Sequence, residues 1–270
     1  MRLRLPRYEL TRCEEILTDA QTGRAYTFAD VRHVAHEFGK GLKARWAWKK
    51  GDVLALFTPN SIDTPVVSLG AIWAGGVVTP ANPLYTVDEL TFQLRDSKAK
   101  GLVTQVSCLD VAVQAAKKAG IPDNRIILLG DKRDPAGKYR HFCSIRSTSY
   151  TGWYAKSSID AKNDLAAIVY SSGTTGLPKG VCLTHTNLVA NLMQFVYVEG
   201  PFLQPHGGAD GLGDKLLGVL PVFHIYVSPC LSPPVLKLRF QILTAPWPGS
   251  LMQLSWSRIL RIPVDYDGKV

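Results

Sequence analysis

The residues best suited to chemistry in this chain lie in one short run, Tyr170-Ser-Ser-Gly-Thr-Thr-Gly-Leu-Pro-Lys-Gly180, directly after the apolar segment 165–169. Glycines allow the backbone to adopt positive φ and to approach a ligand closely. Successive backbone N–H groups, hydroxyls and an ammonium supply donors and positive charge for phosphate oxygens. A surface turn would explain Ser171–Gly176 equally well, but the Pro178-Lys179-Gly180 ending favours a phosphate-binding loop.

This run is not a Walker A loop. Reading the G-x-x-x-x-G-K-[ST] pattern from Gly173 or Gly176 fails, because Lys179 follows a proline and precedes a glycine. The eleven residues instead resemble the phosphate-binding loop of the adenylate-forming superfamily. That superfamily includes acyl- and aryl-CoA synthetases, luciferases and the adenylation domains of peptide synthetases.

Flanking segments extend the resemblance over roughly residues 18–226. Val181–Leu188 is similar to the strand and helix start that follow the loop in the family, and Leu220-Pro-Val-Phe-His-Ile-Tyr226 resembles its second nucleotide-side motif. Four upstream segments are similar to the 4-coumarate–CoA ligase branch: 50–56, 59–60, 75–83 and 85–90.

The resemblance implies roles for individual residues. The loop would embrace the β- and γ-phosphates of ATP, with Lys179 adding charge and Mg²⁺ bridging phosphate oxygens. His224 would lie beside the acyl and adenylate site, and Tyr226 would line the acid pocket. An isolated His-x-Tyr pair would more often be structural, and only its spacing from the loop favours the site. The implied nucleotide-binding set is Ser171, Ser172, Gly173, Thr174, Thr175, Gly176, Lys179 and His224.

The implied reaction is that of an acid–thiol ligase, which activates a carboxylic acid with ATP and then forms a thioester with CoA. A hydroxycinnamate is the first expected acid, with fatty acids close behind. The family's adenine- and ribose-binding residues and its catalytic lysine lie further downstream, so no catalytic residue is assigned. We therefore expect an N-terminal part of such a ligase that is inactive alone. Two alternatives stay open: a non-catalytic nucleotide- or phosphate-binding module, and a non-functional gene product.

Composition narrows the partners and the compartment. The chain of 270 residues has a formal charge of +9 but no block of five basic residues, so we expect a solvated basic surface that suits nucleotide and CoA phosphates rather than nucleic acid. Five cysteines without a C-x-x-C pair indicate reduced thiols and a cytoplasmic protein. The ending Gly-Lys-Val carries no peroxisomal signal.

Two further patterns are discounted. Residues 64–87 carry no charge, but prolines and glycines interrupt them, so we expect no transmembrane segment. His33 and His36 have a helical spacing compatible with metal ligation, but no third ligand accompanies them. Solvated histidines are the expected reading.

The elements that must position the loop alternate between strands and helices. Thr27 is expected to cap a helix, and Thr86 with Glu89 fits a capping box at the start of another. This alternation predicts an α/β fold with an open, mostly parallel sheet and flanking helices, over residues 1–226. Residues 227–270 are broken by prolines and are expected to be an irregular, divergent tail. The expected strands are 53–57, 77–79, 102–104 and 125–129, and the expected helices begin near residues 27, 60, 86 and 110.

Overall fold

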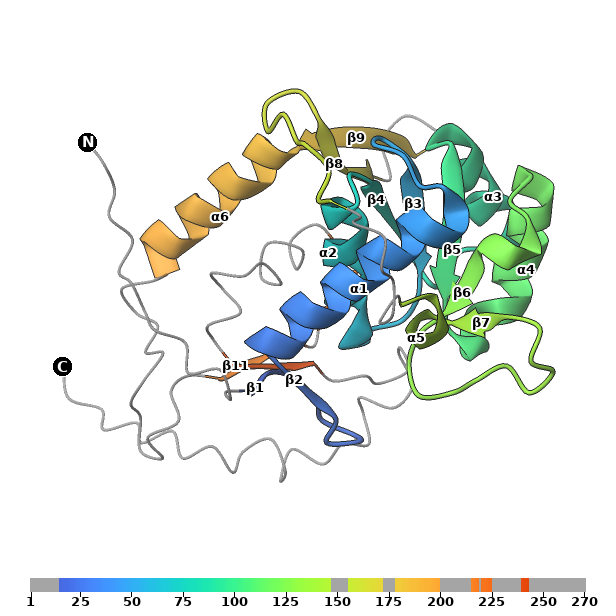
Figure 1. Ribbon diagram of the computed structural model, residues 1–270, viewed down its shortest axis with the longest axis horizontal. Coiled ribbons are helices and arrows are strands. Elements are labelled where there is room, and N and C mark those ends of the chain that lie inside the picture. The colour runs from blue at the N-terminus through green and yellow to red at the C-terminus, as the bar shows by residue number, and fades with distance from the viewer. Residues whose placement is uncertain are drawn as a thin grey trace.

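The computed structural model describes residues 15–146, 155–171, 178–199, 215–218, 220–224 and 239–242 (Figure 1). At its centre is a seven-stranded sheet with the strand order β7-β6-β5-β3-β4-β8-β9. Neighbouring strands run parallel, except that β8 and β9 form an antiparallel pair. The expected α/β fold with an open, mostly parallel sheet is confirmed. Its strands are β3 (Val53–Phe57), β4 (Val77–Ala81), β5 (Ala99–Thr104), β6 (Ile126–Leu128), β7 (Arg140–His141), β8 (Leu165–Ser171) and β9 (Lys179–Thr184).

Helices cover both faces of this sheet. On one face pack α1 (Phe28–Trp46), α2 (Asp63–Trp73) and α5 (Phe142–Ile145), and on the other α3 (Val87–Asp96) and α4 (Leu109–Ala119). Along β3, Leu54 and Leu56 join the core under α1 and α2, whereas Ala55 and Phe57 join the core under α3 and α4. A strand buried on both faces explains why this segment has no polar alternation.

Local sequence signals set the helix ends. Thr27 and Asp30 form a capping box at α1, and Thr86 and Glu89 form another at α3, as the sequence predicts. Gly120 ends α4 in the left-handed conformation, with φ 78°, which a glycine adopts without steric cost. The second helix differs from its prediction because it begins at Asp63 rather than near residue 60.

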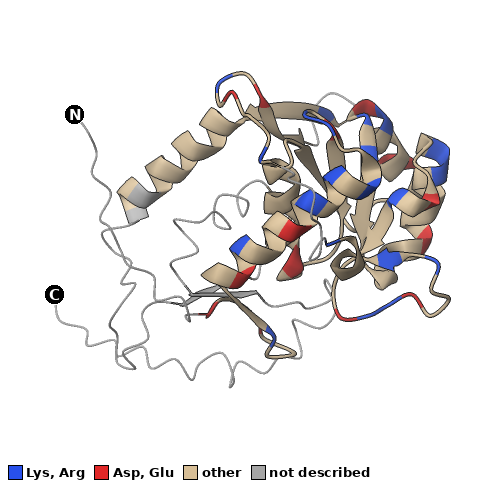
Figure 2. Cartoon of the chain, in the orientation of Figure 1, with Lys and Arg blue, Asp and Glu red and all other residues tan. Residues whose placement is uncertain are grey.

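A second, four-stranded sheet has the order β10-β11-β1-β2. Its strands are β1 (Glu15–Asp19), β2 (Ala25–Thr27), β10 (Lys215–Leu217) and β11 (Arg239–Ile242). β11 lies within residues 227–270, so the expectation of an irregular tail is wrong for these four residues. The remaining elements are α6 (His185–Glu199) and two 3₁₀ turns at 106–108 and 123–125. In Figure 1, α6 extends away from the large sheet, and in Figure 2 none of its described residues is coloured as Lys or Arg.

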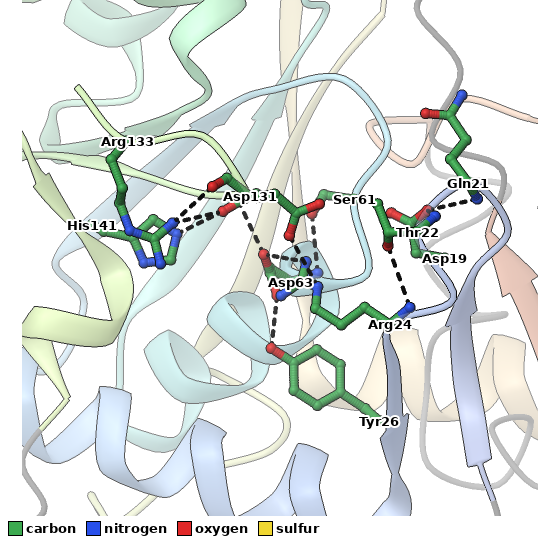
Figure 3. A network of polar contacts seen from close by, with 11 residues as sticks. Asp19, Gln21, Thr22, Arg24, Tyr26, Ser61, Asp63, Asp131, Arg133 and His141 are labelled. Carbon is green, nitrogen blue, oxygen red and sulfur yellow. Dashed lines mark hydrogen bonds and ion pairs between the residues drawn. The ribbon is translucent and has the colours of Figure 1, made fainter. Parts of the chain in front are cut away.

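A buried carboxylate ties the β1–β2 hairpin to the large sheet (Figure 3). Asp63, the first residue of α2, is 0% exposed. Its two oxygens accept bonds from both terminal nitrogens of Arg24 at 2.9 Å and from the Tyr26 hydroxyl at 2.7 Å. The backbone N–H of Gly130, after β6, donates to Asp63 at 3.0 Å. Burial and the Asp63 carboxylate both raise the pKa of Tyr26, so the phenol stays a donor.

Candidate phosphate-binding site

The β8–β9 hairpin places the two ends of the phosphate-loop sequence opposite each other. Ser171, the last residue of β8, pairs with Lys179, the first residue of β9. Both are exposed, and no ion pair among the described residues engages the Lys179 ammonium. Ser171 and Lys179 are therefore held at the mouth of one loop with donors free for an anion. Five site residues lie outside the described part of the chain: Ser172, Gly173, Thr174, Thr175 and Gly176.

Where β8 joins β4, side-chain hydrogen bonds replace backbone hydrogen bonds that are missing from the ladder. Only one ladder pair connects β4 to β8, and Pro80 in β4 has no N–H to donate. The Thr79 hydroxyl instead donates to the carbonyl of Ile168 in β8 at 2.9 Å. Gln93 of α3, 2% exposed, donates from Nε2 to Thr79 Oγ1 at 2.9 Å and to the carbonyl of Pro80 at 3.0 Å. This polar joint fixes the strand that carries the loop.

The residue before the loop anchors β8 to the other layer. The Tyr170 hydroxyl donates to Asp96 at the end of α3, and burial together with Asp96 raises the pKa of Tyr170. Side chains alternate along a strand, so Ser171 faces away from this contact. Gly180 lies opposite Tyr170, where an added Cβ would stand 3.1 Å from the ring and 3.0 Å from the Ile168 side chain. The glycine thus leaves room for the tyrosine.

Asn60 attaches the second nucleotide-side motif to the same edge of the sheet. Its Nδ2 donates to the carbonyls of Leu220 at 3.0 Å and Gly218 at 3.5 Å, and its Oδ1 accepts from the N–H of Val222 at 2.8 Å. His224 ends a turn in which its backbone N–H donates to the carbonyl of Pro221 at 3.0 Å. The His224 side chain is exposed. Tyr226 lies outside the described residues.

These contacts bring the loop mouth and the His224 segment to one edge of the sheet. Asn60 follows β3, Ser171 ends β8, and β4 lies between these two parallel strands. Two strand spacings separate them, or about 10 Å. Ligands of open α/β sheets bind at the carboxyl ends of the strands. The arrangement can hold an anion beside a histidine.

Asn60, Thr79 and Gln93 were not assigned site roles from the sequence. Asn60 lies in the loop that follows β3, the first strand of the large sheet along the chain, and this position is a usable signal for a site residue. Gln93 interrupts the apolar face of α3, which marks a polar side chain facing the core. Their partners, 13 to 162 residues away, cannot be read from local patterns.

The discounted patterns have other contacts. His33 Nε2 lies 3.1 Å from Glu37 Oε1, and the His36 ring packs at a tilt against Trp73, with ring centroids 5.4 Å apart. Within the described ranges, no group of three or more His, Cys, Asp or Glu side chains could hold a metal ion. The part of the chain that the structure describes contains no helix with the length and hydropathy needed to cross a membrane.

Sequence comparisons identify related proteins. A family model described as "AMP-binding enzyme" matches residues 10–254, which runs past Tyr226, where the motif resemblance ends. A 4-coumarate–CoA ligase of Vanilla planifolia is 35% identical over 213 residues, and 4-coumarate–CoA ligase 1 of Narcissus pseudonarcissus is 39% identical over 211 residues. Each alignment covers 78% of this chain, which spans 36% of the relative's length.

Solved structures show the same architecture. ATP-bound MatB from Rhodopseudomonas palustris matches with a TM-score of 0.67 and 28% identity, over 90% of this chain and 44% of MatB. A benzoate CoA ligase from Burkholderia xenovorans matches with a TM-score of 0.72 and 20% identity, over 93% of this chain and 46% of the ligase. At 20% identity the second match supports the fold alone.

Proposed function

The chain belongs to the AMP-binding enzyme family, and from this premise we propose that it supplies the triphosphate grip of an ATP-dependent acid–CoA ligase. One observation carries the proposal. The β8–β9 hairpin presents Ser171 and Lys179 at the sheet edge to which Asn60 attaches the His224 segment, and Lys179 forms no ion pair with any described residue. The 4-coumarate–CoA ligase relatives support this reading.

The proposed chemistry needs charge neutralisation more than a covalent nucleophile. When a carboxylate attacks the α-phosphate of ATP, pyrophosphate leaves, and negative charge builds on the β- and γ-phosphates. The Lys179 ammonium and the loop hydroxyls would hold these phosphates and stabilise that charge. Mg²⁺ would supply further charge neutralisation when bound between phosphate oxygens. The second step, attack of the CoA thiol on the acyl-adenylate, uses no residue that we assign here.

His224 is proposed to lie beside the acyl and adenylate site, and Tyr226 is proposed to line the acid pocket. The His224 side chain is exposed, and Asn60 fixes the backbone at Val222, just before it. A hydroxycinnamate is the proposed acid and a fatty acid the second choice. The names of the 4-coumarate–CoA ligase relatives support the hydroxycinnamate. The cysteine pattern supports a cytoplasmic location.

Binding calorimetry with ATP tests the grip. Replacing Lys179 with alanine should weaken binding by about 1.5–3 kcal/mol, since it removes a charge-assisted contact. Lys162→Ala is the matched control, because Lys162 is also exposed and forms no ion pair among the described residues. Equal ATP affinity of wild type and Lys179→Ala, with both folded by circular dichroism, would contradict the proposal.

Acid-dependent exchange of pyrophosphate into ATP separates a ligase from a non-catalytic phosphate-binding module. Exchange that requires a hydroxycinnamate or a fatty acid identifies the ligase and its acid. ATP binding that Lys179→Ala weakens, without exchange with any acid, favours the binding module.

A further inference from the structure

A hollow of about 360 Å³ lies at the amino ends of the parallel strands of the large sheet, whereas the phosphate loop follows the carboxyl end of β8. It opens where α3 and α4 end and where β5 begins, next to the residues that lead into β6. Because parallel strands point the same way, this is the amino edge of the sheet. Four cationic side chains line the hollow and no acidic one does: Arg95, Lys98, Lys100 and Arg125.

These cations are not neutralised by carboxylates. None of the four takes part in an ion pair among the described residues. Arg95 donates one bond to the carbonyl of Lys118, and Arg125 donates to the carbonyls of Lys100 and Trp46 at 3.3 and 3.2 Å. A guanidinium carries five N–H donors, so both arginines are held in place while most of their donors stay available.

Helix ends account for only part of this charge. The carboxyl ends of α3 and α4 each contribute a partial charge of about −0.5, which favours cations nearby. Together they offset about one of the four positive charges, and about three remain. The nearby Asp96 does not line the hollow, and its carboxylate accepts a hydrogen bond from Tyr170. Lys118 has its own partner in Asp88 at 2.7 Å. The hollow therefore keeps an excess of about three positive charges.

Lys98 adds a second observation. Its φ is 55°, a left-handed conformation in which glycine and asparagine are the usual residues. A lysine at this position carries a backbone cost of about 1 kcal/mol relative to glycine. It nevertheless places a cation on the wall of the hollow.

We propose that this hollow binds a small soluble ligand that carries at least two negative charges on phosphate groups. The two arginine forks match phosphate oxygens in a bidentate manner, and the lysines supply point charges. Leu94 and Ile121 also line the hollow, but they are 1% and 5% exposed, so the accessible part of the lining is mainly cationic and polar. This site is separate from the phosphate loop and does not depend on ligase activity.

Lysine footprinting of the wild-type chain tests the site directly, with pyrophosphate as the probe. Acetylation of Lys98 and Lys100 should slow at least threefold when pyrophosphate is added. Lys117 and Lys162, exposed and outside the hollow, should be unaffected. Protection of Lys179 alone would sustain the proposed function and overturn this second site.

A variant pair provides an independent measurement in a Lys179→Ala background, where the loop lysine is absent. Lys98→Asn with Lys100→Gln removes two charges and keeps a residue that tolerates the left-handed backbone. Lys117→Gln with Lys162→Gln removes the same charge elsewhere. Calorimetry should show pyrophosphate binding at least tenfold weaker for the first pair and within twofold of the background for the second.

Two further outcomes overturn the proposal. Equal weakening by both pairs would mean general charge attraction. Flotation with vesicles that carry phosphorylated inositol lipids, without any binding of pyrophosphate, would assign the hollow to a lipid headgroup instead of a soluble ligand. The footprint uses unmodified protein, so misfolding of a variant leaves the test intact.

Discussion

Replacing Asp63 with asparagine should destabilise the fold without changing the volume of the side chain. Asp63 Oδ1 accepts from Arg24 Nη1 and from the Tyr26 hydroxyl, and Oδ2 accepts from Arg24 Nη2 and the N–H of Gly130. An amide has one oxygen and one NH₂ group. An NH₂ at the Oδ2 position would face two groups that can only donate. At the Oδ1 position it would face Arg24 and a phenol, which can turn and accept.

The second orientation sets the expected cost. One charge-assisted bond to Arg24 is lost, which is worth about 1.5–3 kcal/mol. The Arg24 side chain is 32% exposed, so water can solvate part of the freed charge. We therefore expect a loss of about 2 kcal/mol in the free energy of unfolding, below the 3–5 kcal/mol or so typical of breaking a fully buried pair.

Urea unfolding followed by circular dichroism measures this loss. Asp131→Asn is the matched control: Asp131 also pairs with Arg24, at 3.2 Å, but its side chain is 50% exposed, so its loss should stay below about 1 kcal/mol. Equal shifts for the two variants, or an unchanged midpoint for Asp63→Asn, would refute the argument that burial of the carboxylate gives the network its strength.

Two further predictions concern the same hydrogen-bonded layers. Gln93→Leu removes the donor to Pro80 and Thr79, but it also removes a buried Oε1 that has no partner among the described residues. We therefore expect the free energy of unfolding to fall by about 1 kcal/mol and amide exchange in β8 to become faster. Unchanged amide exchange in β8 would contradict the role of Gln93 in fixing this strand. Above pH ~10, the pKa of an unfolded tyrosine, folding should become less favourable, because the raised pKa values of Tyr26 and Tyr170 favour the neutral phenol in the folded state. This contribution is fully present below that pH and is lost as the pH rises towards the folded pKa values. Tyr26→Phe should flatten the alkaline decline in urea midpoints, and an unaltered decline would count against it.

Local patterns predict the parts of this fold that local forces determine. Thr27 and Thr86 cap their helices because each has an acidic residue three positions on. The apolar run 53–57 becomes a central strand because both of its faces are covered. The start of α2 was wrongly predicted near residue 60, because Asn60 and Ser61 resemble a cap. Asn60 instead binds a segment 160 residues away.

The candidate site, too, depends on contacts between distant segments that local sequence patterns do not reveal. The sequence identifies Lys179 and His224 through motif resemblance, and the structure brings their segments to one edge of the sheet. The roles of Thr79 and Gln93 follow from Pro80, whose missing N–H matters only next to β8. Which strand lies next to which depends on the topology of the sheet, and the periodicity of the local sequence does not specify it.

The parallel pairing of β1 with β11 also affects the order in which this chain can fold during synthesis. The β1–β2 hairpin and its Arg24–Asp63 contact can form once about the first quarter of the chain has emerged, since their contacts are short in sequence. Leu17 must wait for Phe240, about 220 residues later, and closing so long a loop costs only about 2 kcal/mol more than closing one of 20 residues. The time needed to synthesise the intervening residues, rather than the free energy of loop closure, therefore delays the pairing of β1 with β11. Until Arg239–Ile242 leaves the ribosome, one edge of β1 stays open to any other strand, which makes this interval the period when β1 is most exposed to intermolecular pairing.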